Sequence, residues 1–231
     1  MTDYVIPAPV QAALPVEGTS ALFPVRRILC VGRNYAAHRR EMGGDDREPP
    51  FFFAKPADAV VPAGGSVAYP SATGNLHHEI ELVAALGGGG ADISPADALE
   101  LVWGYAAGVD LTRRDLQNAA KDKGQPWDAS KGFDQSAPIG LIRPAAGPTA
   151  GMASPQGAIA LSVNGQIRQQ ASLSDMIWNL AEVISQASRL WRLAPGDLIF
   201  TGTPEGVGPL VRGDRVEGRI EDVGEVGFTI V

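Results

Sequence analysis

The chain has 231 residues, 45% of them hydrophobic, and a mean hydropathy near zero, which is the profile of a soluble globular protein with a sizeable core. Its single cysteine, Cys30, excludes an intramolecular disulfide and a thiolate-rich metal site, and it fits a reducing compartment. The formal net charge of −7, with dispersed basic residues, argues against a nucleic-acid-binding surface, so any site for an anion has to be built locally.

The N-terminal residues carry neither a basic leader nor a continuous apolar segment, and no later stretch reaches the roughly 18 apolar residues that cross a bilayer. We therefore expect a cytoplasmic protein without a membrane partner. Residues 1–24 contain four prolines and little periodicity, which predicts an extended N-terminal segment. A single domain is expected over residues 25–231.

The first part of this domain alternates short apolar runs with turn residues. The run 28–31 predicts a strand, and Asn34 is placed to cap a brief helix over 35–42 that ends at a glycine pair. Residues 50–56 and 78–86 predict two buried strands, the first ended by a proline and the second by a run of glycines.

The middle of the chain contains two helix-start patterns around one apolar strand. Residues 94–97 combine a cap residue with proline at the first helical position, and residues 112–115 resemble a capping box that opens a helix ending near Gly124. Between them, residues 103–110 predict a central strand rich in small residues. Residues 143–157 are rich in Pro, Gly and Ala and predict a surface loop.

The C-terminal part contains the strongest local patterns. Residues 159–164 and 167–169 flank an Asn-Gly pair, which predicts a β-hairpin. Residues 175–191 carry apolar side chains at 3.6-residue spacing and predict an amphipathic helix, after which 198–201 begins a series of short strands. Strands outnumber helices and are mostly joined by turns, so the fold class is α+β.

Two acids at alternate positions of the predicted strand 78–86 are candidates for a functional site. In a strand, the side chains of Glu79 and Glu81 point to one face, while Ile80 and Leu82 point to the other. Parallel carboxylates are costly to bury unless solvent, a basic residue or a cation neutralises them. A solvated strand face is the ordinary alternative for such a pair.

A second apolar strand ends in an isolated acid, Asp110, which can supply a third carboxylate to Glu79 and Glu81. Three carboxylates without a cysteine favour a hard cation such as Mg²⁺ or Mn²⁺. The adjacent His77 and His78 leave zinc as a weaker alternative, because no further clustered histidine accompanies them.

Several motifs occur in one order along residues 25–231, and together they resemble the fumarylacetoacetate hydrolase family. The motifs are Gly32-Arg33-Asn34-Tyr35 with His38 and Glu41, Lys55-Pro56, His78-Glu79-Ile80-Glu81-Leu82, Asp110 with Arg114-Asp115 and Gln117, Lys131, and Thr201-Gly202-Thr203-Pro204 with Gly206-Val207-Gly208.

The resemblance implies a mixed β-roll or β-sandwich of the fumarylacetoacetase C-terminal type with a few flanking helices, usually assembled as a homodimer. It implies an Mg²⁺ or Mn²⁺ ion held by Glu79, Glu81 and Asp110, and a substrate that is a small anionic 2-oxo or 2,4-dioxo acid. The resemblance also assigns catalytic roles, with His38 and Glu41 as a water-activating dyad and Lys131 stabilising negative charge. It places these residues near the substrate: Arg33, Tyr35, Lys55, Arg114, Gln117 and Thr203.

Taken singly, these residues have ordinary structural interpretations. His38 and Glu41 have the spacing of an exposed helix pair, and Arg114 and Gln117 that of a helix surface. Only their joint occurrence favours a site.

The activity expected from the resemblance is hydrolysis of a carbon–carbon bond, because the dyad at His38 and Glu41 is present. Segments 23–28, 47–53 and 134–140 are similar to those of bacterial family members that hydrolyse fumarylpyruvate in aromatic-acid catabolism. Acylpyruvase, oxaloacetate decarboxylase and diene-dioate isomerase or decarboxylase activities of the same family remain alternatives. A non-catalytic small-molecule-binding protein is the alternative from another class.

Overall fold

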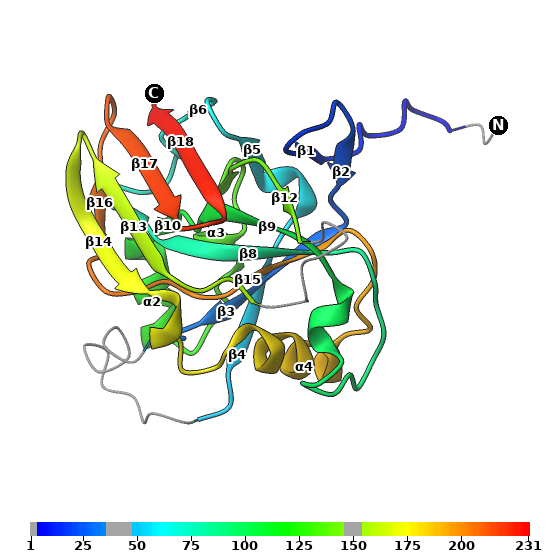
Figure 1. The fold of residues 1–231 in the computed structure, drawn as a ribbon. Helices are drawn as coiled ribbons and strands as arrows, with labels where there is room; N and C mark the ends of the chain where they lie inside the picture. The colour runs from blue at the N-terminus through cyan, green and yellow to red at the C-terminus, as the bar shows by residue number, and fades with distance from the viewer. Residues whose placement is uncertain (1–3, 36–47, 146–153) are drawn as a thin grey trace.

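The computed structural model describes residues 4–35, 48–145 and 154–231 (Figure 1). Strands dominate these residues and only a few helices flank them, which confirms the predicted α+β class. The predicted helix 35–42 lies outside the described residues apart from its first position.

The strands are β1 (Ala13–Pro15), β2 (Leu22–Pro24), β3 (Arg27–Gly32), β4 (Phe51–Lys55), β5 (Val60–Pro62), β6 (Ser66–Val67), β7 (Leu76–His78), β8 (Ile80–Leu86), β9 (Val102–Val109), β10 (Thr112–Arg113), β11 (Ala137–Ile139), β12 (Arg143–Pro144), β13 (Ala158–Val163), β14 (Gln166–Ser172), β15 (Asp197–Phe200), β16 (Gly208–Leu210), β17 (Arg215–Ile220) and β18 (Gly224–Ile230). The helices are α2 (Arg114–Asp122), α3 (Asp128–Lys131) and α4 (Leu180–Leu190), with 3-10 turns η1 (Ala57–Ala59), η2 (Ala98–Leu101) and η3 (Leu173–Asp175).

The largest sheet runs in the order β4-β3-β15-β8-β9-β11-β5, with β12 beside β9. Strand β8 is buried along its whole length because both faces of the sheet are covered. Leu82 and Leu86 pack into the core that the large sheet shares with a second sheet, whereas Val83 and Ala85 pack into a smaller cluster on the opposite face. The alternation of strand side chains therefore holds through β8.

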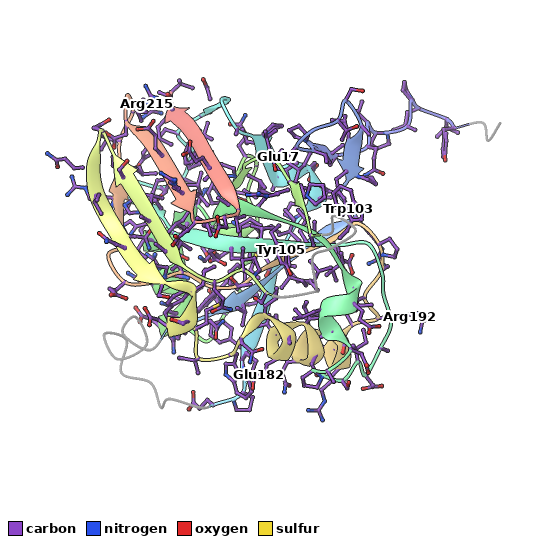
Figure 2. All side chains as sticks on the ribbon, viewed as in Figure 1. Glu17, Trp103, Tyr105, Glu182, Arg192 and Arg215 are labelled. Carbon is purple, nitrogen blue, oxygen red and sulfur yellow. The ribbon has the colours of Figure 1, made fainter. Side chains whose placement is uncertain are left out.

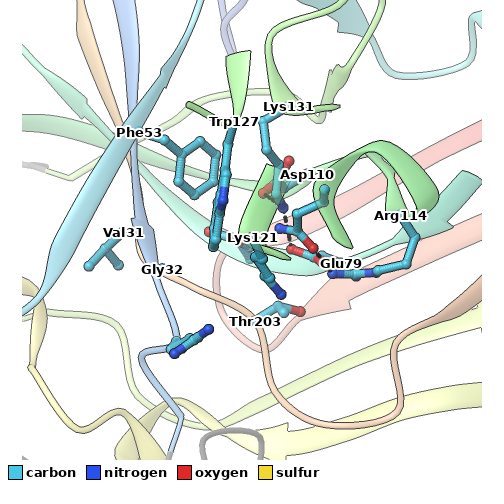
Figure 3. A pocket seen from close by; sticks show the side chains of 13 residues that line it. Val31, Gly32, Phe53, Glu79, Asp110, Arg114, Lys121, Trp127, Lys131 and Thr203 are labelled. Carbon is cyan, nitrogen blue, oxygen red and sulfur yellow. Dashed lines mark hydrogen bonds and ion pairs between the residues drawn. The ribbon is translucent and has the colours of Figure 1, made fainter. Parts of the chain in front are cut away.

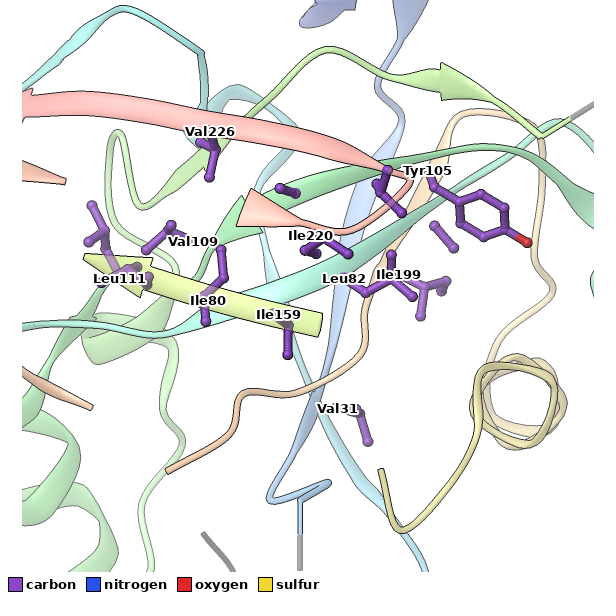
Figure 4. Close-up of a cluster of buried hydrophobic side chains, with 14 of the residues drawn as sticks. Val31, Ile80, Leu82, Tyr105, Val109, Leu111, Ile159, Ile199, Ile220 and Val226 are labelled. Carbon is purple, nitrogen blue, oxygen red and sulfur yellow. The ribbon is translucent and has the colours of Figure 1, made fainter. Parts of the chain in front are cut away.

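The second sheet has the order β14-β13-β17-β18-β6, and it packs across the large sheet. Its strand β13 contributes Ile159, and its strands β17 and β18 contribute Ile220 and Val226, to the same core as Leu82 and Val109 (Figure 4). This arrangement is the predicted β-sandwich with flanking helices. The hairpin predicted around Asn164-Gly165 forms as β13 and β14.

Two small sheets complete the fold. Strands β10, β7 and β16 form a three-stranded sheet, and β1 pairs with β2 as an antiparallel ribbon. The ribbon lies within the segment for which the sequence predicts an extended conformation, and its Leu14 is fully buried in the smaller core cluster.

Some predicted helices differ in extent. Helix α4 begins at Leu180 rather than near residue 175, because Ser172 caps the 3-10 turn η3 and Asn179 forms the capping box of α4 with Glu182. The helix predicted after residues 94–97 is reduced to the 3-10 turn η2. Ser94 and Asp97 bond each other there, within the connection between β8 and β9.

Some charged side chains lie at the periphery of the molecule, and a smaller group is buried. Figure 2 shows Arg192 and Arg215 pointing outward, and both are exposed, whereas Tyr105 lies within the fold and is buried. Burial raises the pKa of Tyr105 to about 12, so its hydroxyl stays protonated at neutral pH. No helix among the described residues is long and apolar enough to cross a membrane.

Candidate active site

The pairing of β8 with β9 brings the three predicted carboxylates together. Glu81 lies opposite Gly108 in the ladder, and the backbone amide of Asp110 donates to the carbonyl of Glu79 at 2.8 Å. Glu79 itself occupies the break between β7 and β8, so the predicted strand 78–86 is interrupted at its first acid. The three side chains nevertheless meet, with one oxygen of each within 4.8 Å of the others.

The acidic group formed by Glu79, Glu81 and Asp110 is deeply buried, with relative exposures of 6%, 1% and 0%. Asp110 Oδ1 accepts no hydrogen bond from the described residues, although the Lys55 ammonium lies 2.8 Å away as an ion-pair partner. A convergent set of carboxylate oxygens, one of them without a hydrogen bond, suits a hard divalent cation. The residues present therefore fit the Mg²⁺ or Mn²⁺ that the motifs predict.

Neither neighbouring histidine belongs to the acidic group. His78 contacts Gln169 Oε1 through Nδ1 at 3.0 Å, and His77 contacts Asn75 through Nε2 at 2.9 Å. Burial lowers the pKa of both imidazoles, that of His77 to about 4, which keeps them neutral. The geometry favours a carboxylate site over the zinc alternative.

Lys131 forms ion pairs with two of the three carboxylates of the acidic group. Its Nζ, carried on α3, lies 2.7 Å from Glu79 Oε2 and 2.5 Å from Asp110 Oδ2, and it also donates to Thr112 Oγ1 at 2.7 Å. Burial lowers the pKa of Lys131, but Asp110 and Glu79 outweigh burial and raise it, so the side chain is a cation. Because Lys131 takes the Thr112 hydroxyl, the capping box predicted at residues 112–115 does not form.

The three carboxylates are not electrostatically equivalent. Burial raises the pKa of Glu79, but Lys131 and Arg114 reverse this effect and hold its pKa well below the usual range. Burial, Asp110 and Glu79 all raise the pKa of Glu81, whose Oε2 accepts the Gly202 amide at 2.6 Å. Glu81 thus gains more from a neighbouring cation than Glu79 does.

A cavity opens beside the acidic group, and Glu79, Glu81 and Asp110 contribute to its lining. Helix α2 places two predicted substrate residues at this cavity. Arg114 donates to Gln117 Oε1 at 2.5 Å and pairs with Glu79, and both side chains line the cavity. Asp115, at the next position of the helix, accepts hydrogen bonds from Thr73 and Gly74 and so fixes the start of α2 to the preceding loop. This bonding explains why an acid follows Arg114.

The loop after β15 supplies another predicted substrate residue. Thr203 lines the cavity, and its hydroxyl accepts a hydrogen bond from Gln169 Nε2 at 2.8 Å. Gly202 has φ +94°, and an added Cβ would lie 2.7 Å from the Asn34 side chain. Glycine is therefore required where the loop turns to present its amide to Glu81.

The other predicted residues lie in different positions. Arg33 lines the cavity, with its Nε buried and without a hydrogen-bond partner among the described residues. Lys55 is fully buried behind Asp110 and donates to the carbonyls of Leu111 and Lys131, so it supports the acidic group rather than lining the cavity. Tyr35 is also buried, and its backbone pairs with Met176. The predicted dyad, His38 and Glu41, lies outside the described residues.

Figure 3 shows three cavity residues that the sequence interpretation did not include: Phe53, Lys121 and Trp127. Lys121 follows Gln117 by four positions and Arg114 by seven, so helical spacing was the signal that could have identified it. Its Nζ lies 5.2 Å from the centroid of the Trp127 ring. The two aromatic residues form an apolar wall beside the charged end of the cavity.

Comparisons with known proteins show the family to which the chain belongs. A family model described as fumarylacetoacetate (FAA) hydrolase C-terminal matches residues 27–231. A fumarylpyruvate hydrolase from Ralstonia sp is 47% identical over 183 residues, which are 79% of this chain and 93% of that protein. A mitochondrial oxaloacetate tautomerase from Mus musculus is 41% identical over 206 residues, which are 89% of this chain and 91% of that protein.

A solved structure has the same fold over almost the whole chain. It is a fumarylpyruvate hydrolase from Pseudomonas aeruginosa in complex with Mn²⁺ and pyruvate, with 52% sequence identity, a TM-score of 0.94 and coverage of 99% of each chain. The family model and the relatives together confirm the resemblance drawn from the motifs. This chain therefore belongs to the fumarylacetoacetate hydrolase family and is an enzyme of that family.

Proposed function

We propose that this enzyme is an Mg²⁺- or Mn²⁺-dependent hydrolase that cleaves the C3–C4 bond of a 2,4-dioxo acid, with fumarylpyruvate as the substrate and fumarate and pyruvate as the products. The observation that carries the proposal is the buried acidic group of Glu79, Glu81 and Asp110, in contact with Lys131, in a cavity that also contains Arg114. The names of the Ralstonia and Pseudomonas proteins support the substrate, and the Mn²⁺ of the Pseudomonas structure supports the ion. This reaction belongs to aromatic-acid catabolism of the gentisate type.

The side chains around the acidic group have complementary roles toward such a substrate. A divalent ion bound by the acidic group would polarise the 2-oxo group and so favour departure of an electron pair toward C3. Arg114 is placed to pair with a substrate carboxylate, because its guanidinium reaches the cavity from α2. Lys131 and Gln117 are placed to stabilise the oxygen that becomes negative during bond cleavage, an effect typically worth about 3 kcal/mol per donor.

Hydrolysis also requires activation of water, which we assign to His38 oriented by Glu41. A neutral imidazole takes a proton from water, and the resulting hydroxide attacks the C4 carbonyl carbon. The C3–C4 bond then breaks, its electron pair passes to C3, and protonation of C3 gives pyruvate while C4 leaves as the carboxylate of fumarate. One water molecule is consumed for each bond cleaved.

Oxaloacetate tautomerisation is the second candidate, favoured by the relative from Mus musculus. Tautomerisation moves a proton between carbon and oxygen without water as a reactant, so it needs the acidic group and Lys131 but no hydroxide. The decarboxylase and diene-dioate isomerase activities of the family likewise use a 2-oxo acid. The cavity geometry alone is compatible with each of them, and the proposal for hydrolysis depends on His38 and Glu41.

A spectrophotometric assay distinguishes these activities. Fumarylpyruvate, acetylpyruvate and both tautomers of oxaloacetate are each supplied to the purified protein with Mg²⁺, with Mn²⁺ or with a chelator. Metal-dependent loss of fumarylpyruvate with equal amounts of fumarate and pyruvate is expected. Interconversion of oxaloacetate tautomers without fumarylpyruvate hydrolysis would support the second candidate, and no metal-dependent turnover of any compound would leave a non-catalytic binding protein.

We also propose that residues 25–231 form the catalytic domain and that the protein is a homodimer. The domain proposal is supported by the distribution of the cavity residues, which lie between Val31 and Thr203. Light scattering after size-exclusion chromatography tests the dimer, since a mass of one 24.1 kDa chain would contradict it.

A further inference from the structure

Helix α2 presents three polar side chains to the cavity, and one of them, Lys121, is a cation without an anionic partner in the part of the chain that the structure describes. Arg114 pairs with Glu79 and with Gln117, so two of the three are joined to each other and to the acidic group. Among the described residues, Lys121 forms no ion pair with a carboxylate, and its ammonium lies against the ring of Trp127. In Figure 3 the Lys121 side chain reaches past Trp127 toward Thr203.

The charges around the cavity also leave a cationic excess. The three carboxylates of the acidic group face three cations, Lys55, Lys131 and Arg114. These cations form ion pairs with Asp110 and Glu79, whereas Glu81 accepts a hydrogen bond from the Gly202 amide. Two further cations that line the cavity, Arg33 and Lys121, are then in excess among the described residues, before a divalent ion is added. A bound anion with more than one negative charge would complement such a cavity better than a monoanion.

The burial and the bonding of the two surplus cations, Arg33 and Lys121, also indicate that the cavity complements an anion with more than one negative charge. Lys121 is about half-buried, and burial together with Arg114 and Arg33 lowers its pKa to about 8. The Arg33 Nε is buried without a hydrogen-bond partner among the described residues, and its guanidinium carbon lies 5.8 Å from the centroid of the Phe51 ring. Both groups therefore have unused capacity for an anion in a place where water is partly excluded.

We propose that Lys121, assisted by Arg33, binds the carboxylate at the far end of a dianionic 2,4-dioxo acid, and that it thereby selects diacids over monoacids. This inference rests on the proposed function, which places the 2-oxo acid end of the substrate at the acidic group. Phe53 and Trp127, whose ring planes are tilted by 51°, offer an aromatic surface to the unsaturated carbon chain between the two ends. Lys121 is on this view a specificity-determining residue, and the sequence motifs of the family resemblance do not contain it.

Ligand binding tests the inference without requiring turnover. Two inert ligands of equal length, 2-oxohexanedioate and 2-oxohexanoate, share the 2-oxo acid end and differ only in the distal carboxylate. Their dissociation constants are measured by calorimetry on the Mn²⁺-loaded protein, for the native chain, for Lys121→Met and for Lys123→Met. Lys123 is an exposed residue at the end of α2 and serves as the matched control.

The native chain and Lys123→Met are expected to bind the diacid about tenfold or more tightly than the monoacid, the size of one charge-assisted hydrogen bond. Lys121→Met is expected to bring the ratio close to one, and Lys121→Arg to restore most of it. An unchanged ratio in Lys121→Met, or an equal loss of affinity for both ligands, would overturn the inference. Because these ligands are not cleaved, such a result is independent of whether fumarylpyruvate is hydrolysed.

Discussion

Lys131 Nζ lies 2.7 Å from Glu79 Oε2, although the two residues come from α3 and from the break between β7 and β8. Both groups are almost completely buried, and the same ammonium also contacts Asp110. In the absence of an ion, this lysine is therefore a principal counter-charge for the acidic group. Metal binding and protein stability are consequently coupled at this position.

Replacement of Lys131 by methionine should leave buried carboxylates partly uncompensated. We expect a loss of about 3 kcal/mol in the free energy of unfolding in the presence of a chelator, as is usual when one partner of a buried ion pair is removed. Mn²⁺ should restore part of this loss, because the cation replaces the missing charge. Urea unfolding with and without Mn²⁺ measures both effects. Equal losses in both conditions would contradict the coupling.

Glu81→Gln should weaken binding of the metal ion. The amide oxygen can still accept the hydrogen bond from Gly202, so the loop remains in place while one negative charge is lost. We expect Mg²⁺ and Mn²⁺ affinity to fall roughly 100-fold. Calorimetric titration measures it, with the exposed Glu217→Gln as a control. Unchanged affinity would remove Glu81 from the set of metal ligands.

His38→Ala should abolish hydrolysis of fumarylpyruvate and leave metal affinity nearly unchanged, because the proposed role of His38 is to activate water. General-base catalysis typically contributes about 100-fold to 10,000-fold in rate, so a loss in kcat of this size is expected. Steady-state kinetics and metal titration on the same preparation measure the two quantities. Loss of the metal in this variant would refute the assigned role, and retained oxaloacetate tautomerisation would show that the remaining site is intact.

Gly202→Ala should disturb the position of Glu81 in the acidic group, although Gly202 is not itself a member of that group. The added methyl group would lie 2.7 Å from the Asn34 side chain at a position with φ +94°, so the loop that presents the Gly202 amide to Glu81 has to move. We expect lower thermal stability and weaker Mn²⁺ binding. Gly213→Ala is the matched control, because φ is +92° there and no atom lies within 4 Å of the added group. Similar metal affinities in the two variants would contradict the prediction.

The pKa of Lys121 predicts a pH dependence for diacid substrates. Burial first, and then Arg114, Arg33 and Lys131, lower this pKa and Glu79 raises it, and the balance brings it to about 8. Only the protonated ammonium attracts an anion, so kcat/KM for fumarylpyruvate should decline as pH rises through about 8. Lys121→Arg keeps its charge and should move this decline to higher pH. Profiles from about pH 6 to about pH 10 test it, and superimposable curves for the two proteins would refute it.

The acidic group could be predicted because its signal is local. Period-two alternation placed Glu79 and Glu81 on one strand face, and Asp110 was an isolated acid at the end of an apolar strand. The structure keeps this arrangement despite the strand break at Glu79, since the backbone bond between Asp110 and Glu79 holds the two strands in register. Their role as ligands stays a prediction.

Features that depend on competition between partners could not be predicted. Thr112 and Asp115 have the pattern of a capping box, but Lys131 takes the hydroxyl and the loop at Thr73 takes the carboxylate. The resemblance places Lys55 at the substrate, and only the pairing of β4 with β3 at the edge of the large sheet places it behind Asp110. Lys121 has the helical spacing of Arg114 and Gln117, but spacing alone does not distinguish a lysine that faces a cavity from one that faces solvent.

The acidic group and the rim of the cavity differ in how they are supported. Glu81 is fixed by the hydrogen-bond ladder between two central strands, whereas Arg33 and Thr203 follow the ends of β3 and β15, and Lys121 lies near the end of α2. Replacements at the rim are therefore expected to alter which acyl group fits without disturbing the strands that carry the proposed metal ligands. A mutant library aimed at new substrates is best confined to these rim positions, where substitutions are expected to leave metal binding by the acidic group intact.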